Sequence, residues 1–113
     1  MLTCVSSSVY TIFGEELELD DLHDIVNHGM ECGVSGFIYS SELDDKFTKN
    51  EDEIMNYLDR FCDDCFGQSA CSYIAEQLSF DDKSWTMQEF KEYAVWMYVE
   101  LRAHDIINDV EDN

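Results

Sequence analysis

The sequence contains no proline and only five glycines among 113 residues, so the residues that most often interrupt helices are scarce. Positive charge is also scarce, because 6 Lys and Arg stand against 26 Asp and Glu, for a formal net charge of −20. Direct binding to nucleic acid or to an anionic membrane requires basic patches. These absences favour helical structure and argue against nucleic acid and membrane as ligands.

A secretion signal is also missing. No Lys or Arg precedes the first apolar residues, and Ser6, Ser7 and Ser8 interrupt any apolar stretch, so we expect neither a signal peptide nor a spanning helix. An odd number of cysteines without such a signal predicts reduced thiols rather than a disulfide framework. We therefore expect the protein in the cytoplasm of its host cell. The five cysteines are Cys4, Cys32, Cys62, Cys65 and Cys71.

Apolar residues make up 45% of the chain and aromatic residues 13%, which is more than acidic disordered segments contain. We therefore expect residues 1–113 to fold as a single acidic domain around one core. Repulsion among 20 uncompensated negative charges destabilises a compact fold. So large an excess indicates that the charge is used, and it fits a basic partner.

The spacing of apolar residues predicts a mainly α, compact domain of about four helices. The first helix is expected over Glu15–His28, with Gly29 as its left-handed C-terminal cap. The second is expected to begin at Asn50, with Glu53 completing a capping box, and to end at Gly67.

Two further helices are predicted in the C-terminal half. Ser69 is expected to cap a shorter helix whose apolar face extends to Leu78. Thr86 and Glu89 form a capping-box pattern before the last helix, whose helical spacing continues to Leu101. Residues 1–13 are equally compatible with a strand and a helix, and residues 34–39 are expected to form a short extended or β segment.

The acids run through the predicted helices rather than forming a tail: residues 14–40 hold seven without any Lys or Arg, and residues 41–65 hold nine against three. Glu16, Asp20 and Asp24 follow each other at four-residue steps, which is about 6 Å along a helix axis. This separation is comparable to that of phosphates on a nucleic-acid strand, where charges recur about every 3.4 Å of axis. Because like charges at this spacing destabilise a helix, we expect function to favour them. The predicted partner-binding residues are Glu15, Glu16, Asp20, Asp21, Asp24, Asp44, Asp45, Glu51, Asp52, Asp63 and Asp64.

Aromatic residues near these acids are candidate anchors for the same contact, because exposed charges add more to association rate than to affinity. Each is equally compatible with a place in the core. The candidates are Tyr39, Phe47, Tyr57, Trp85 and Trp96.

The sequence gives little support for a metal site or a catalytic site. Cys62 and Cys65 have the spacing of zinc ligands, with Cys71 nearby, but both lie on the apolar face of a predicted helix, which favours a role in the core. The sequence contains no calcium-binding, phosphate-binding or dinucleotide-binding motif. Cys32 and His28 are one candidate nucleophile and base, yet no convergent set surrounds them. We expect no metal, no cofactor and no catalytic residues, so the protein is not expected to be an enzyme.

The stretch from His28 to Tyr39, with Phe47, Glu53-Ile54 and Leu58 after it, resembles a family of small uncharacterised phage-borne acidic domains. The final segment is similar to that family's closing helix. This resemblance implies a phage origin and assigns no functional residue. The residues that carry the likeness of the final segment are Phe90, Trp96 and Glu100-Leu101-Arg102-Ala103.

In size and acidity the chain is similar to phage anti-restriction and anti-CRISPR proteins that act as DNA mimics, a likeness of class rather than of motif. The expected function is therefore inhibition of a basic, nucleic-acid-binding host defence protein, such as a restriction, CRISPR or other nuclease complex. The alternative is a non-catalytic protein-binding module that docks through an apolar patch, with acidity serving solubility and steering. The sequence leaves open which partner is bound and whether a homodimer extends the acidic surface.

Overall fold

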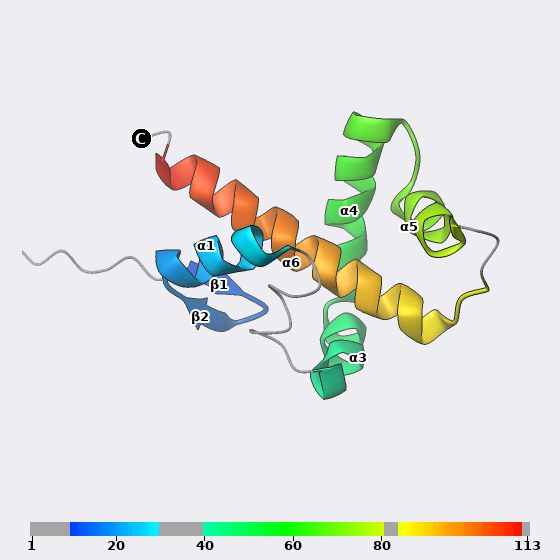
Figure 1. The fold of residues 1–113 in the computed structure, drawn as a ribbon, viewed down its shortest axis with the longest axis horizontal. Helices are drawn as coiled ribbons and strands as arrows, with labels where there is room; N and C mark the ends of the chain where they lie inside the picture. The colour runs from blue at the N-terminus through cyan, green and yellow to red at the C-terminus, as the bar shows by residue number, and fades with distance from the viewer. Residues whose placement is uncertain (1–9, 30–39, 81–83, 112–113) are drawn as a thin grey trace, which may run out of the picture. The chain divides into compact units, whose positions relative to one another are not determined.

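The computed structural model describes residues 10–29, 40–80 and 84–111 (Figure 1). The chain divides into two compact units. We call residues 1–37 with 99–113 the terminal unit, and residues 38–98 the central unit. Helix α6 (Met87–Glu111) begins in the central unit and ends in the terminal unit. A single domain over the whole chain stays a prediction.

The terminal unit opens with a hairpin. Strands β1 (Tyr10–Ile12) and β2 (Glu15–Leu17) pair antiparallel, with Ile12 opposite Glu15. The two turn residues, Phe13 and Gly14, both have positive φ (58° and 78°), as in the tight hairpin turns whose twist matches that of the strands. Residues 1–13 were compatible with either a strand or a helix, and their described C-terminal part forms a strand.

Helix α1 (Leu19–His28) corrects the first predicted helix, which was expected to start at Glu15. Because Glu15–Leu17 pairs with β1, the helix begins only after Glu18. Glu18 is extended (φ −91°, ψ 166°) and forms a capping box with Asp21. The predicted end is right, because Gly29 follows the helix with a φ of 86°. Its ψ of 172° is extended, however, so the expected left-handed cap is not formed.

The central unit contains α3 (Ser40–Lys49), α4 (Glu51–Phe66) and α5 (Ala70–Leu78), and α4 packs against both of the others. The predicted bounds of the second helix are confirmed by α4, and Gly67 ends it in the left-handed conformation (φ 67°, ψ 28°). The predicted Ser69 cap of α5 is also confirmed, since its Oγ accepts a hydrogen bond from the backbone N–H of Ser72 at 3.1 Å.

Two details of the central unit differ from prediction. The capping box at Asn50 is absent, because the Asn50 side-chain amide instead donates to the carbonyl oxygen of Lys46 at 2.9 Å. Helix α3 was not predicted at all. Within its described side chains only Leu43 and Phe47 are buried apolar groups, which is too few for its apolar spacing to stand out.

Helix α6 starts where the sequence indicated. The Oγ1 of Thr86 accepts a hydrogen bond from the backbone N–H of Glu89 at 3.2 Å. The first half of the helix supplies buried side chains to the central unit, and the second half supplies them to the terminal unit. These are Phe90, Ala94, Val95, Met97 and Tyr98 in the first half, and Val99, Ala103 and Ile107 in the second.

The described part of the chain thus holds five helices and a two-stranded sheet, and the fold is mainly α as predicted. Residues 34–39, where an extended segment was expected, lie outside the described residues. None of the described helices combines the length and the apolar character that crossing a membrane requires.

Candidate functional site

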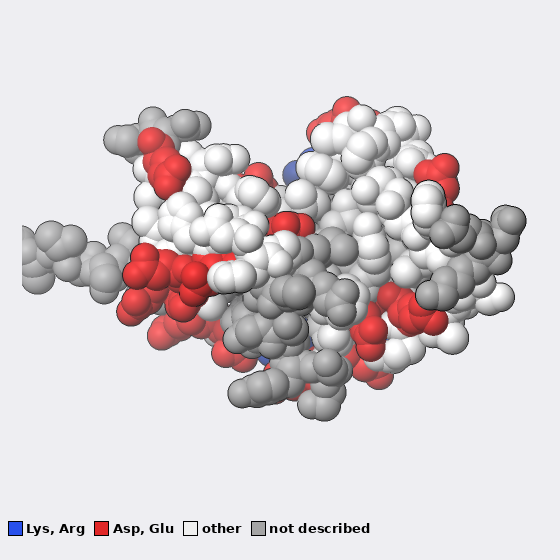
Figure 2. Space-filling view, viewed as in Figure 1, with Lys and Arg blue, Asp and Glu red and all other residues white. Residues whose placement is uncertain are grey.

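All eleven acids predicted to bind a partner are exposed to solvent. Five of them belong to the terminal unit and six to the central unit. In Figure 2 the red carboxylates of the terminal unit gather over β2 and the first turn of α1. Each unit therefore has its own acidic surface.

The terminal unit positions its acids with two different elements. Glu15 and Glu16 lie on β2, whereas Asp20, Asp21 and Asp24 lie on α1. Glu16 is thus not on the helix, and the predicted series of three carboxylates at four-residue steps is wrong. Only Asp20 and Asp24 remain a like-charged pair one helical turn apart.

Two of these carboxylates stabilise the start of helix α1. Asp20 and Asp21 are in the first turn of α1, where the helix dipole favours negative charge. Asp21 also accepts a hydrogen bond from the backbone N–H of Glu18 through Oδ2, at 3.0 Å. These two acids have a structural reason to be present, so partner binding is not needed to explain them.

Lysines neutralise the two predicted acids of α3. Asp44 pairs with Lys91 of α6 at 2.9 Å, and Asp45 pairs with Lys49 one turn further along α3 at 3.1 Å. Exposed pairs of this kind contribute little to stability. They do lower the negative potential at Asp44 and Asp45, which are consequently weaker candidates for partner binding.

Helix α4 carries predicted acids at both of its ends. Glu51 and Asp52 are in the first turn, and Asp63 and Asp64 lie 12 residues further on, which corresponds to about 18 Å along the axis. That distance matches the axial rise of about five phosphates on one nucleic-acid strand. A single helix therefore holds two carboxylate pairs about 18 Å apart along its axis.

The two ends of α4 differ in electrostatic terms. Acids in the first turn are favoured by the helix dipole, whereas Asp63 and Asp64 stand near the negative end, where the last turn contains no basic residue. Within the described residues, neither side chain has an ion pair or a hydrogen bond. Asp63 and Asp64 thus oppose the helix dipole, and the described contacts give neither side chain a structural partner.

Four of the predicted aromatic anchors lie within the described residues, and none is fully exposed. Phe47 is buried, with its ring edge-on to that of Phe90 (centroids 6.5 Å apart), and Trp85 stacks on the same Phe90 ring at 5.9 Å. Tyr57 packs edge-on against Tyr98 at 5.2 Å. These rings pack against one another within the central unit. The half-buried Trp96 shares α6 with Phe90 and Tyr98, and Tyr39 lies outside the described residues.

A partly exposed aromatic cluster that the sequence pattern did not predict lies at the end of α4. Phe66, the last residue of the helix, is 49% exposed and stacks in parallel on Tyr73 of α5, with ring centroids 4.7 Å apart. Phe61 meets Phe66 edge-on at 6.1 Å. The available signal was a bulky aromatic residue directly before the glycine that ends the helix, and two residues after Asp63-Asp64. We call Phe61, Phe66 and Tyr73 the Phe66 cluster.

The cysteines of α4 separate into two environments. Cys62 is buried in the apolar face, and burial raises the pKa of its thiol, with the nearby charges of Asp59 and Cys65 adding to the rise. Cys65, expected on the same apolar face, is exposed, as is Cys71. Within the described ranges no three His, Cys, Asp or Glu side chains come together as a metal site would require. The core interpretation is therefore confirmed for Cys62 and wrong for Cys65.

Both histidines of α1 have structural partners. His28, in the last turn, places its Nδ1 atom 2.9 Å from the carbonyl oxygen of Asp24, which fits the predicted interaction with the helix end. His23 lies 3.3 Å from the carboxylate of Glu111 at the end of α6. Cys32, the candidate nucleophile, lies outside the described residues.

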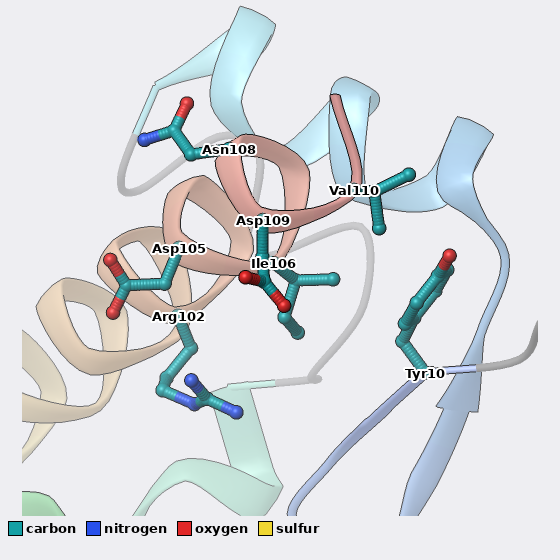
Figure 3. A pocket seen from close by; sticks show the side chains of 7 residues that line it. All are labelled: Tyr10, Arg102, Asp105, Ile106, Asn108, Asp109 and Val110. Atoms are coloured by element: carbon teal, nitrogen blue, oxygen red, sulfur yellow. The ribbon is translucent and has the colours of Figure 1, made fainter. Parts of the chain in front are cut away.

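An open depression of about 510 Å³ lies in the terminal unit (Figure 3). Its walls come from Tyr10 of β1 and from the last turns of α6, where Asp105 and Asp109 stand one turn apart and Arg102 precedes them. The three charged side chains each take part in interactions already. Its described lining residues include neither cysteine nor histidine and hold two carboxylates against one guanidinium, so they give no preference for an anionic ligand.

Comparison with known proteins identifies the family of the chain. No curated protein and no solved structure matches it significantly. A family model described as a domain of unknown function (DUF7222) matches residues 4–112. Because that match spans nearly the whole sequence, the chain belongs to the DUF7222 family.

Proposed function

We propose that the protein is a phage-type inhibitor that binds a basic, nucleic-acid-binding host defence protein by presenting carboxylates in place of DNA phosphates. A restriction complex, a CRISPR effector or another nuclease is the class of target that this chemistry fits. Binding would be stoichiometric and non-catalytic. The partner's Arg and Lys side chains, which otherwise contact phosphate, would form charge-assisted hydrogen bonds with the carboxylates.

The observation that carries the proposal is the exposure of all eleven predicted acids on a chain with a net charge of −20. Such a surface attracts basic partners over long distances and repels nucleic acid itself. The carboxylate pairs about 18 Å apart on α4 add a spacing that a groove built for several consecutive phosphates accommodates.

The contacts of the acids separate them into stronger and weaker candidates. Asp20 and Asp21 stabilise the start of α1, and Asp44 and Asp45 are paired with lysines. Four predicted acids have exposed carboxylates without a hydrogen bond or an ion pair within the described residues, and without a place in the first turn of a helix. These are Glu16, Asp24, Asp63 and Asp64.

Neutralising these four acids tests the proposal. A host protein is first captured from a cell lysate on the immobilised chain. The variant E16Q/D24N/D63N/D64N should bind this captured protein much more weakly than the unmodified chain, and the deficit should shrink as salt rises. Binding is measured by calorimetry at two salt concentrations, with circular dichroism to establish that the variant is folded. Unchanged affinity in a folded variant would contradict the proposal.

A second variant separates the arrangement of the charges from their number. E89Q/E92Q/E100Q/E111Q removes the same amount of charge from glutamates outside both the predicted set and the aromatic cluster at the end of α4. We expect it to retain most of the affinity. Equal losses in the two variants would mean that net charge alone steers association, and the particular carboxylates would then have no special role.

The alternative function is a protein-binding module that docks through apolar contacts. Exposure of Phe66 favours it, because large aromatic side chains at a surface are typical binding anchors. In that case the complex should tolerate high salt, and the four-acid variant should bind normally.

A further inference from the structure

The Phe66 cluster combines exposed aromatic surface with negative charge. Phe66 is half exposed, although it is stacked on Tyr73, so one of its faces is covered by that ring and the rest remains available to a partner. Phe61 closes one side of the cluster with an edge-on contact. The rings hold one another in place, so little side-chain entropy is lost when a partner binds.

Each ring of the cluster has a carboxylate three residues away on the same helix. Asp63 precedes Phe66, Asp64 follows Phe61, and Glu76 follows Tyr73. Residues at this spacing are neighbours on a helix surface. The side chain of Glu76 is fixed by a hydrogen bond from Gln68 Nε2 at 3.1 Å.

The basic residue nearest in sequence does not neutralise this group. Arg60 stands one turn before Asp64, but the described residues contain no ion pair between the two side chains. The negative end of the α4 dipole adds to the local potential. A cation is therefore attracted both by the carboxylates and by the faces of the aromatic rings.

From this arrangement we propose that the Phe66 cluster is a docking surface for an arginine-bearing segment of a basic protein partner. A guanidinium group is planar and weakly hydrated, so it stacks on an aromatic face while its N–H groups donate to the neighbouring carboxylates. A lysine ammonium gains only the electrostatic part of this interaction. The surface should consequently prefer arginine to lysine.

Single-stranded nucleic acid also stacks on exposed aromatic side chains, but it does so in grooves with positive charge along its backbone. Here each ring has a carboxylate three residues away on its own helix, and these carboxylates would repel the phosphates. The charge around the cluster therefore selects a protein segment. The inference rests on the basic partner of the proposed function and specifies which residue type this part of the surface binds.

Two peptides of equal charge test the preference directly. Hexa-arginine and hexa-lysine are titrated into the isotope-labelled full chain, and backbone NMR shifts give both the affinity and the position of binding. We expect hexa-arginine to bind more tightly, with the largest shifts at residues 61–76. Equal affinity for the two peptides, or shifts confined to other parts of the chain, would overturn the inference.

Substitution of Phe66 tests the role of the ring. F66A should weaken hexa-arginine binding about two- to five-fold, the range of an exposed cation–π contact, and should affect hexa-lysine less. F66L keeps apolar area without an aromatic face and should show the same loss. F80A is the matched control, because Phe80 is 74% exposed and has no ring contact within the described residues. The inference fails if F80A and F66A act alike, or if F66L binds both peptides like the unmodified chain.

The failure of this inference differs from that of the proposed function. If E16Q/D24N/D63N/D64N loses the host protein while F66A and F66L keep the arginine preference, the DNA-mimic proposal stands and the Phe66 surface is wrong. If the preference depends on Phe66 but the captured host protein is not displaced by DNA, the docking surface stands and DNA mimicry is wrong.

Discussion

Aspartates with the same side chain serve different purposes in this protein, depending on where they lie on a helix. Asp21 is in the first turn of α1 and accepts a hydrogen bond from the Glu18 backbone, so it stabilises the helix start. Asp63 and Asp64 are in the last turn of α4, where carboxylates oppose the dipole. Only the second arrangement carries a cost in stability.

This contrast predicts opposite effects on stability. D63N/D64N should raise the free energy of unfolding by about 0.3–1 kcal/mol, because it removes negative charge from the negative end of α4. D21N should lower it by a similar amount, since the amide is a weaker acceptor in the capping box. Urea denaturation at low salt measures both. A destabilised D63N/D64N variant would show that these carboxylates have a structural role instead.

At the scale of elements, helix ends marked by side-chain caps were the most predictable part of the fold. Ser69 and Thr86 lie where their hydroxyl groups accept hydrogen bonds from helix N–H groups, and Gly67 has the positive φ that its position demanded. These signals are local and are correct at three helix ends. The equally local signals at Asn50 and Gly29 do not produce the predicted caps, because the Asn50 amide donates to Lys46 instead and Gly29 has an extended ψ.

The elements that were missed depend on information that is not local. Glu15–Leu17 directly precedes the apolar spacing of α1, and its pairing with β1 follows a turn in which Phe13 adopts a positive φ that is uncommon for a bulky residue. Helix α3 has two buried apolar side chains among its described residues, and it packs on α4. The exposure of the predicted acids could be expected from their charge. The position of Glu16 on a strand and the lysine partners of the α3 acids could not, because both depend on the tertiary fold.

The cap of α5 offers a test at this scale. S69A should destabilise the protein by about 1 kcal/mol, because the backbone N–H of Ser72 loses its acceptor. S84A, at an exposed serine outside the helices, is the control and should change stability little. Thermal unfolding followed by circular dichroism compares the two. Equal midpoints for S69A and the unmodified protein would mean that the cap makes no net contribution.

For the whole molecule, the dominant feature is an excess of charge that the fold does not neutralise. The described residues contain ion pairs at Asp44 and Asp45, whereas the chain has 26 acids and 6 Lys and Arg in total. Self-repulsion of this size lowers stability and raises the rate of encounter with basic proteins. A function that depends on a basic partner gives one account of both the charge and its exposure.

The most direct test of that account is capture of a partner from a bacterial cell lysate at low salt. The retained proteins are identified after a salt step, and the purified partner is then challenged on the immobilised chain with duplex DNA. DNA mimicry predicts a nucleic-acid-binding protein that is released both by salt and by competing DNA. A partner that resists salt and DNA alike would contradict it, and would point to docking through apolar surface instead.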